Sequence, residues 1–117
     1  RDLGSARLAA FAVRDAINAG LFPGPRILAA GAALSIVGGH GDVSGFSPAV
    51  NDALDQGNTC TGAVECAARV REASQRGADV IKFTATGGVL SQQGRGLDQH
   101  FTDAEMQAIV TTAHSLG

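Results

Sequence analysis

The sequence predicts an α/β fold in which short apolar strands alternate with helices. Apolar, partly β-branched runs at residues 26–30 and 80–84 read as buried strands. Apolar residues recur at near-helical spacing over residues 7–19, 61–76 and from residue 102 onward. The glycine-rich loops all follow strands, whereas the links from helix to strand are short. This order favours parallel strands with right-handed crossovers, as in a (β/α) barrel or a doubly wound sheet.

In the first half of the chain, residues 1–5 read as the end of a strand, followed by a helix over 7–19. Two prolines and a glycine within residues 21–26 predict a turn, because proline excludes helix there. The apolar run at 26–30 is the next predicted strand. Residues 31–57 then form a long connection, and connections of that length are usually functional or mobile.

In the second half, residues 61–76 are predicted to form a helix that ends at Gly77. The strand at 80–84 follows after a very short link. Residues 102–105 read Thr-Asp-Ala-Glu, which is a capping box and marks the start of a third helix.

The composition excludes several classes of protein. The chain has 117 residues, room for at most one domain over residues 1–117. A content of 44% hydrophobic and 17% charged residues is typical of a globular chain. The net charge of −2 and the absence of a basic cluster argue against nucleic-acid binding. No apolar run approaches the ~18 residues of a membrane span. No secretory signal is visible, so a cytoplasmic location is expected; the chain opens at Arg1 without a Met, and a signal peptide upstream of it is the alternative.

The two cysteines, Cys60 and Cys66, lie six residues apart. No second Cys/His pair stands at zinc-site spacing, which argues against a structural zinc. With Cys66 inside the predicted helix and Cys60 just before it, a disulfide would be awkward though possible. We therefore expect free thiols in a reducing compartment.

Lys82 is the only lysine of the chain. The chain has nine basic residues, and the other eight are arginine. It lies within an apolar run, so one interpretation is a lysine that extends to the strand end or pairs with an acid. The other is a functional amine at the carboxyl end of a strand, where the active sites of such folds gather. In a strand, Val80 and Thr84 would share its face, and Ile81 and Phe83 would lie on the other.

Five motifs then occur in an order seen in the amidohydrolase superfamily. They are Arg-Asp-Leu-Gly-Ser at 1–5, Ala-Gly-Leu-Phe-Pro-Gly-Pro-Arg-Ile-Leu at 19–28, Gly-Gly-His-Gly-Asp at 38–42, Gly-Ala-Asp-Val-Ile-Lys-Phe-Thr-Ala-Thr-Gly-Gly-Val-Leu-Ser at 77–91 and Phe-Thr-Asp-Ala-Glu at 101–105. The chain most resembles the imidazolonepropionase-like branch, which includes Xaa-Pro dipeptidases (prolidases) and related N-acyl amino-acid hydrolases. The resemblance covers essentially the whole chain.

This resemblance implies a (β/α)8 TIM-type barrel that holds two divalent metal ions, usually zinc. Residues 1–5, 26–30 and 80–84 would be strands two, three and four. About two and a half β/α units cannot close a barrel of ~250 residues, so the chain is expected to be an internal fragment. Its open edges and apolar helix faces would favour a homo-oligomer or association with the remainder of the barrel.

The resemblance also implies roles for individual residues. Lys82 matches a carboxylated lysine that gives one carbamate oxygen to each metal ion. His40 matches a loop histidine placed to meet the substrate, although a loop histidine satisfied by backbone groups is the alternative. Asp42 would orient His40 or stabilise the loop. Gly87 and Gly88 would shape the wall of the substrate pocket rather than bind phosphate, because Walker spacing is absent.

Three further polar residues are weaker candidates. Arg95 and His100 follow the strand that carries Lys82, so they are candidates to line the pocket. They belong to a part of the family that varies among its members. His114, on the third predicted helix, is most simply a surface or helix-end residue. No catalytic residue is assigned within this segment, because the family's other metal ligands and its general acid/base lie on strands that this chain lacks.

The resemblance thus predicts a segment of a binuclear metal-dependent enzyme that cleaves an Xaa-Pro dipeptide or an N-acyl amino acid through a metal-bound hydroxide. The isolated chain would be inactive. One alternative is a non-catalytic module that associates through its open barrel edges. The other is a doubly wound domain that binds a nucleotide or phosphate through the loop at 86–91. In such a domain Lys82 has no role.

Overall fold

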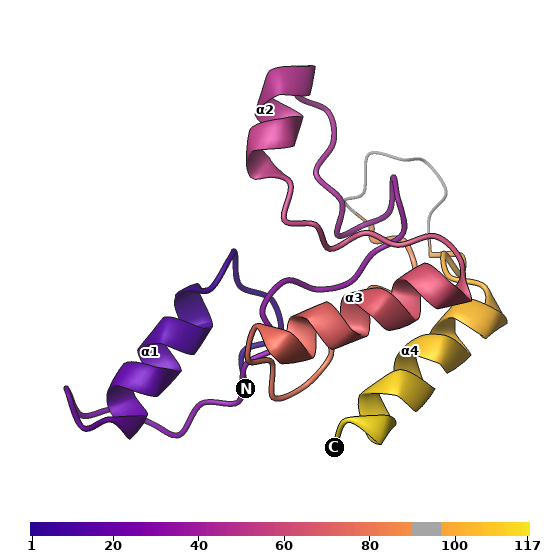
Figure 1. Ribbon diagram of the computed structural model, residues 1–117. Helices are drawn as coiled ribbons and strands as arrows, with labels where there is room; N and C mark the ends of the chain where they lie inside the picture. The colour runs from indigo at the N-terminus through magenta and orange to yellow at the C-terminus, as the bar shows by residue number, and fades with distance from the viewer. Residues whose placement is uncertain (90–96) are drawn as a thin grey trace.

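The computed structural model describes residues 1–89 and 97–117 (Figure 1). The helices of this part of the chain are α1 (Ala9–Asn18), α2 (Pro48–Leu54), α3 (Ala63–Gln75) and α4 (Asp103–Ser115). None of these helices is long and apolar enough to cross a membrane. The helices α3 and α4 pack against each other, and α1 and α2 lie apart from that pair (Figure 1).

The three predicted helices are confirmed as α1, α3 and α4. The bounds of α1 and α3 lie within two residues of the predicted ones, and α4 begins one residue after the predicted start. The predicted capping box of α4 is present. The Thr102 hydroxyl accepts from the backbone N of Glu105 at 3.3 Å, and the Glu105 carboxylate accepts from the backbone N of Thr102 at 2.8 Å. The start of α4 is therefore set by residues that are neighbours in the sequence.

The prediction that residues 31–57 form one long loop is wrong in part, because α2 lies within it. Pro48 occupies the first turn of α2, where a missing N–H costs nothing. This helix buries none of its residues, so no packed apolar face holds it against the core.

The predicted strands at 26–30 and 80–84 are not formed as regular strands. Within the described residues, extended segments meet through isolated bridges. Three of these bridges are parallel, and all three involve one central segment, residues 28–35: Asp2 pairs with Ala29, Leu34 with Phe83 and Ser35 with Thr59. The predicted parallel direction is therefore present, while a continuous sheet is not.

Gly31 explains why the pairing is interrupted. It lies between the bridges at Ala29 and Leu34 with φ 71°, in the left-handed region that breaks an extended chain. A Cβ at this position would lie 2.8 Å from Cζ of Phe11, so the close contact with α1 also requires glycine. Beyond Gly31 the chain becomes extended again as far as Ser35, so the connection begins later than predicted.

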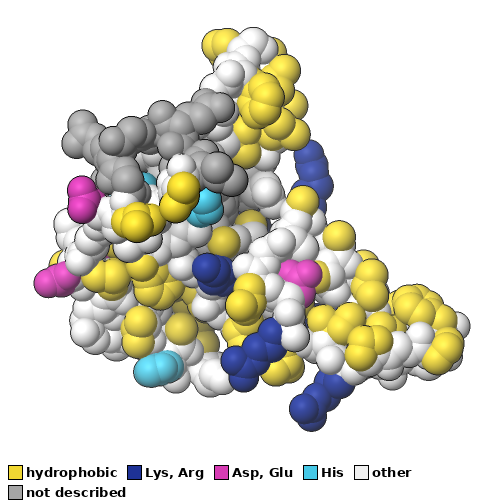
Figure 2. Space-filling model, turned by 180° about the vertical axis from the view of Figure 1, so that it is seen from behind, with side chains coloured by type: hydrophobic (Ala, Val, Ile, Leu, Met, Phe, Trp, Pro, Cys, Tyr) yellow, Lys and Arg dark blue, Asp and Glu magenta, His cyan; other side chains and the backbone are white. Residues whose placement is uncertain are grey.

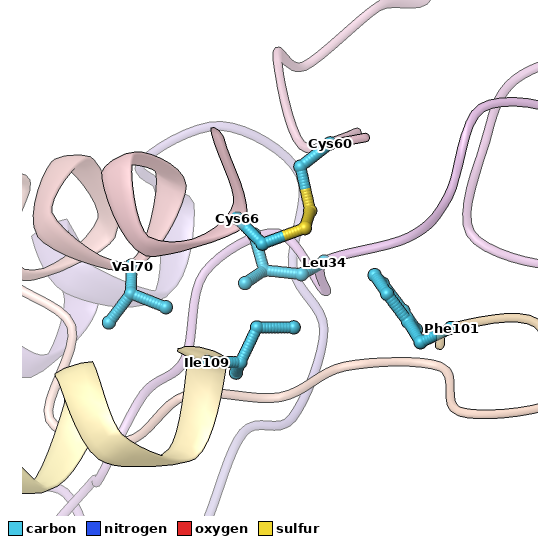
Figure 3. Close-up of a cluster of buried hydrophobic side chains, with 6 residues drawn as sticks. All are labelled: Leu34, Cys60, Cys66, Val70, Phe101 and Ile109. Carbon is cyan, nitrogen blue, oxygen red and sulfur yellow. A yellow bond between two sulfur atoms is a disulfide. The ribbon is translucent and has the colours of Figure 1, made fainter. Parts of the chain in front are cut away.

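The hydrophobic core lies between the extended segments and the α3–α4 pair (Figure 3). Its buried members come from both helices and from the segments beside them: Leu34, Cys60, Cys66, Val70, Phe101 and Ile109. Ile81 and Phe83 pack against this cluster, and the Phe83 ring meets the Phe101 ring edge-on at 5.8 Å. This geometry is favourable for aromatic pairs.

The prediction of free thiols is wrong, because Cys60 and Cys66 form a disulfide (Figure 3). The helix begins at Ala63, two residues later than predicted, and Gly62 turns the chain with φ 81°. Cys60 thereby returns over the first turn of α3, with its Cα 5.1 Å from that of Cys66, well within disulfide range. Disulfides are typical of oxidising surroundings, so the expectation of a reducing compartment loses its basis.

Candidate functional site

Lys82 lies in the extended segment that follows α3 and is partly buried. Its backbone carbonyl accepts a hydrogen bond from the Leu34 N–H at 2.8 Å. The residues on either side of it, Ile81 and Phe83, both pack against the core. Because successive side chains of an extended segment alternate, the Lys82 side chain lies on the face opposite the helices.

Within the described part of the chain, no carboxylate lies within ion-pair distance of Lys82; the ion pairs found there involve Arg14 and Arg69. This removes the interpretation in which the lysine simply pairs with a described acid. Figure 2 shows the molecule from behind, with basic and histidine side chains beside one another near the middle of the surface. Because Ile81 and Phe83 pack against the core, the alternation of side chains puts the Lys82 amine on the side that the α3–α4 core does not cover.

His40 lies exposed in a tight turn that begins directly after the central segment. The Asp42 carboxylate accepts from the Gly38 N–H at 2.6 Å, and Asp42 N–H donates to the Gly39 carbonyl at 3.1 Å. A Cβ on Gly39 would lie 2.6 Å from the Ser35 hydroxyl, so the turn needs glycine there. Asp42 therefore stabilises the loop, as one interpretation of the sequence predicted.

Gly87 is buried, and its N–H donates to the Asp98 carbonyl at 3.2 Å. An antiparallel bridge joins Thr86 to Gln99, and His100 N–H donates to the Ala85 carbonyl at 2.9 Å. Residues 85–87 are therefore paired with 98–100, and the Gly87 amide is already used within the backbone. This pairing argues against a phosphate cradle at this glycine.

The remaining candidates have different surroundings. Gly88 is partly buried and follows Gly87 directly. Arg95 lies outside the described residues. Nδ1 of His100 is buried and has no hydrogen-bond partner within the described residues, although the residue as a whole is only partly buried. His114 is exposed in the last turn of α4, which confirms the helix-end interpretation.

The structure relates the Lys82 segment to the His40 turn through the central segment. Leu34 binds the Lys82 carbonyl through its N–H, and its own carbonyl accepts from Thr84 N–H at 2.9 Å. Because these segments run parallel, the His40 turn and the loop of Gly87 and Gly88 follow them at the same end. Ligand sites of parallel α/β folds lie at that end.

A complete metal site is not present in the described residues. They contain no group of three His, Cys, Asp or Glu side chains able to hold an ion. A binuclear centre needs several ligands, and Lys82 alone of the predicted ligands belongs to this chain. The donor set therefore does not suffice to hold two metal ions here.

Two acidic residues hold the segments around this region: Asp79, which the sequence analysis did not single out, and Glu105, the acid of the predicted capping box. The Asp79 carboxylate accepts from Ala29 N–H at 2.9 Å and from Arg14, and these contacts, the Ala29 bond first, lower the pKa of Asp79. Glu105 accepts from the backbone N–H groups of Thr102 and Gly62, which lower its pKa. An acid directly before an apolar run was the only sequence signal for Asp79.

Comparisons with known proteins match the chain over its whole length. The model of the amidohydrolase family matches residues 1–117. Ochratoxinase of Aspergillus niger is 34% identical over 116 residues, which cover 86% of this chain and 24% of that protein. The chain therefore spans about a quarter of this curated relative.

Solved structures give the same result in three dimensions. A Xaa-Pro dipeptidase with methionine bound in its active site is 40% identical, with a TM-score of 0.86 over 97% of this chain and 28% of that one. A. niger ochratoxinase is 30% identical in the structural comparison, with a TM-score of 0.73 over 95% of this chain and 29% of that one. Phenylurea hydrolase B is 25% identical, with a TM-score of 0.73 over 99% and 30%.

Proposed function

Because this chain belongs to the amidohydrolase family, we propose that it is part of a metal-dependent hydrolase that cleaves an amide or peptide C–N bond. Its extended segments correspond in this proposal to three neighbouring strands of a (β/α)8 barrel. The observation that carries the proposal is the alternation at residues 81–83. Two apolar side chains face the core, so the lysine between them faces away from it.

Lys82 is the proposed metal ligand. The neutral form of a lysine amine adds CO2. The nitrogen forms a bond to carbon and loses a proton, which leaves an anionic carbamate with two oxygens. In a complete barrel this carbamate would help to hold two divalent ions, which we take to be zinc. Such ions supply polarisation of the scissile carbonyl and a lowered pKa of bound water when they are present.

His40, Gly87 and Gly88 are the proposed substrate contacts. Xaa-Pro dipeptides and N-acyl amino acids both carry a free carboxylate, and an imidazole N–H can donate a hydrogen bond to it. His40 is exposed at the tip of its turn, next to the segment that pairs with Lys82. Gly87 and Gly88 follow the Lys82 segment and carry no Cβ, a property that lets a ligand approach a backbone closely.

A chimera tests this function. Residues 1–117 would replace the matching part of the Xaa-Pro dipeptidase, which supplies the remaining ligands. We expect the chimera to hydrolyse dipeptides and to lose activity on treatment with a chelator. Lys82→Ala should reduce kcat/KM by more than about 100-fold, since even residues that only support metal ligands contribute 10–100-fold.

Two further variants sharpen the result. Lys82→Arg keeps a cation but cannot take up CO2, so it should lose as much activity as Lys82→Ala. Arg71 is exposed on α3, away from the proposed site, and Arg71→Ala should leave kcat/KM unchanged. Full activity in Lys82→Ala would contradict the proposal and favour a binding domain in which this lysine has no role.

A further inference from the structure

Asn58 is a buried polar residue that the proposed function does not use. Its side chain is 7% exposed, although it lies between an exposed helix and a disulfide. Both hydrogens of its amide are donated to distant backbone carbonyls: Nδ2 lies 2.6 Å from the Ala33 oxygen and 3.0 Å from the Gly41 oxygen. An asparagine amide has two donors, so its donor capacity is fully used.

Gly41, the residue after His40, is thereby held at both of its backbone groups. Its carbonyl accepts from Asn58, and its N–H donates to the Ser35 hydroxyl at 3.1 Å. Ser35 is completely buried, and its hydroxyl donates in turn to the Ile36 carbonyl at 3.0 Å. The residue next to the proposed substrate contact is therefore anchored by two buried side chains.

The segment that carries Asn58 is itself fixed from two sides. Ser35 N–H donates to the Asn58 carbonyl, and Cys60 N–H donates to the Ser35 carbonyl, each at 3.0 Å. Two residues beyond Asn58, the Cys60–Cys66 disulfide joins this segment to α3. The amide of Asn58 thus links the His40 turn to a rigid part of the core.

We infer that Asn58 is a positioning residue, which holds the His40 turn in the orientation that the substrate requires. The inference rests on the proposed function, in which His40 meets the substrate. The core packing in this region comes from Cys60 and its neighbours, whereas the polar contacts of Asn58 go to Gly41 and Ala33, beside the turn. Asn58 orients the turn without touching the substrate.

Nuclear magnetic resonance of the isotope-labelled 117-residue chain tests this role without any need for activity. Asn58→Asp keeps the shape of the side chain but presents a carboxylate to two carbonyl oxygens. We expect the His40 ring signals to shift and the Gly41 amide to exchange at least about tenfold faster, because the turn loses buried hydrogen bonds. The His114 ring signals, from the far end of α4, should stay unchanged.

Asn51→Asp is the matched control, since Asn51 of α2 also donates from Nδ2 to a backbone carbonyl, that of Phe46, at 3.2 Å, and not to the His40 turn. This variant should leave the His40 signals and the Gly41 exchange rate as they are. Unchanged His40 signals in folded Asn58→Asp would overturn the inference. Altered His40 signals in Asn51→Asp of the same size would do so as well.

If Asn58→Asp does not fold, a measurement on the unsubstituted chain tests the role of Asn58 instead. The side-chain amide protons of Asn58 should exchange at least about tenfold more slowly than those of the exposed Asn18. Equal rates would overturn the inference. These results do not depend on Lys82 or on metal. A chimera that does not hydrolyse dipeptides, together with an ordered His40 turn, would therefore contradict the proposed function and leave the role of Asn58 standing.

Discussion

The Asp79 carboxylate lies 2.6 Å from the guanidinium of Arg14, which is 65 residues earlier in the chain. Arg14 also donates to the Gly77 carbonyl at 2.6 Å, and its guanidinium lies 5.2 Å from the centre of the Phe11 ring. Asp79 and Ala29 exchange two further bonds, each at 2.9 Å. One carboxylate therefore joins α1, the central segment and the beginning of the Lys82 segment.

Replacing this carboxylate should loosen α1 from the rest of the chain. Asp79→Asn should lower the free energy of unfolding by about 1–2 kcal/mol, because the ion pair and one charge-assisted bond to Ala29 are weakened. Asp15→Asn is the matched control: Asp15 also pairs with Arg14, but its side chain is 64% exposed. That control should cost less than about 0.5 kcal/mol in urea denaturation. Equal losses in both variants would contradict this account.

The stability of the chain should fall in acid. Contacts with backbone N–H groups lower the pKa of Asp79 below 3.8 and that of Glu105 below 4.5 in the folded chain. The unfolded chain therefore binds more protons as the pH falls, so the stabilisation by both groups is present above about pH 4.5 and is lost as the pH falls through their folded pKa values.

Glu105→Gln isolates the contribution of the group with the higher ordinary pKa. We expect a lower free energy of unfolding near neutral pH and a flatter decline on the acid side than in the unsubstituted chain. Urea midpoints measured from about pH 6 to about pH 3 check this. An unchanged acid slope in Glu105→Gln would show that other groups cause the decline.

The disulfide should contribute to stability by restricting the unfolded chain. Replacing both Cys60 and Cys66 by serine should lower the free energy of unfolding by about 2 kcal/mol for a loop of this length. A thiol assay of the denatured, unreduced chain should detect no free thiol, and reduction should release both. Detection of two thiols before reduction would contradict the bond.

The isolated chain should be inactive and should self-associate. Several large apolar side chains are exposed in the described part of the chain, among them Leu21 at 77% and Val64 at 87%. Such side chains favour burial against another surface. Sedimentation should show a concentration-dependent oligomer, and a dipeptide panel should show no turnover. A monomer at all concentrations, or chelator-sensitive turnover, would contradict these expectations.

The local patterns of the sequence predicted the helices that have strong local signals. The capping box of α4 and the apolar spacing of α3 act between residues a few positions apart, so they can be read without knowing the fold. The parallel direction of the extended segments followed from their alternation with helices. The family resemblance likewise depends on order and motif alone, and the match over residues 1–117 confirms it.

Only the tertiary structure decided which distant groups meet. Gly31 approaches Phe11 of α1 closely, the disulfide depends on where α3 begins, and α2 forms although none of its residues is buried. Likewise, the bond from Asn58 to Gly41 joins residues 17 positions apart. Hydrogen bonds and packing between remote segments form only after the chain brings those segments together, and no local pattern of residues records that approach.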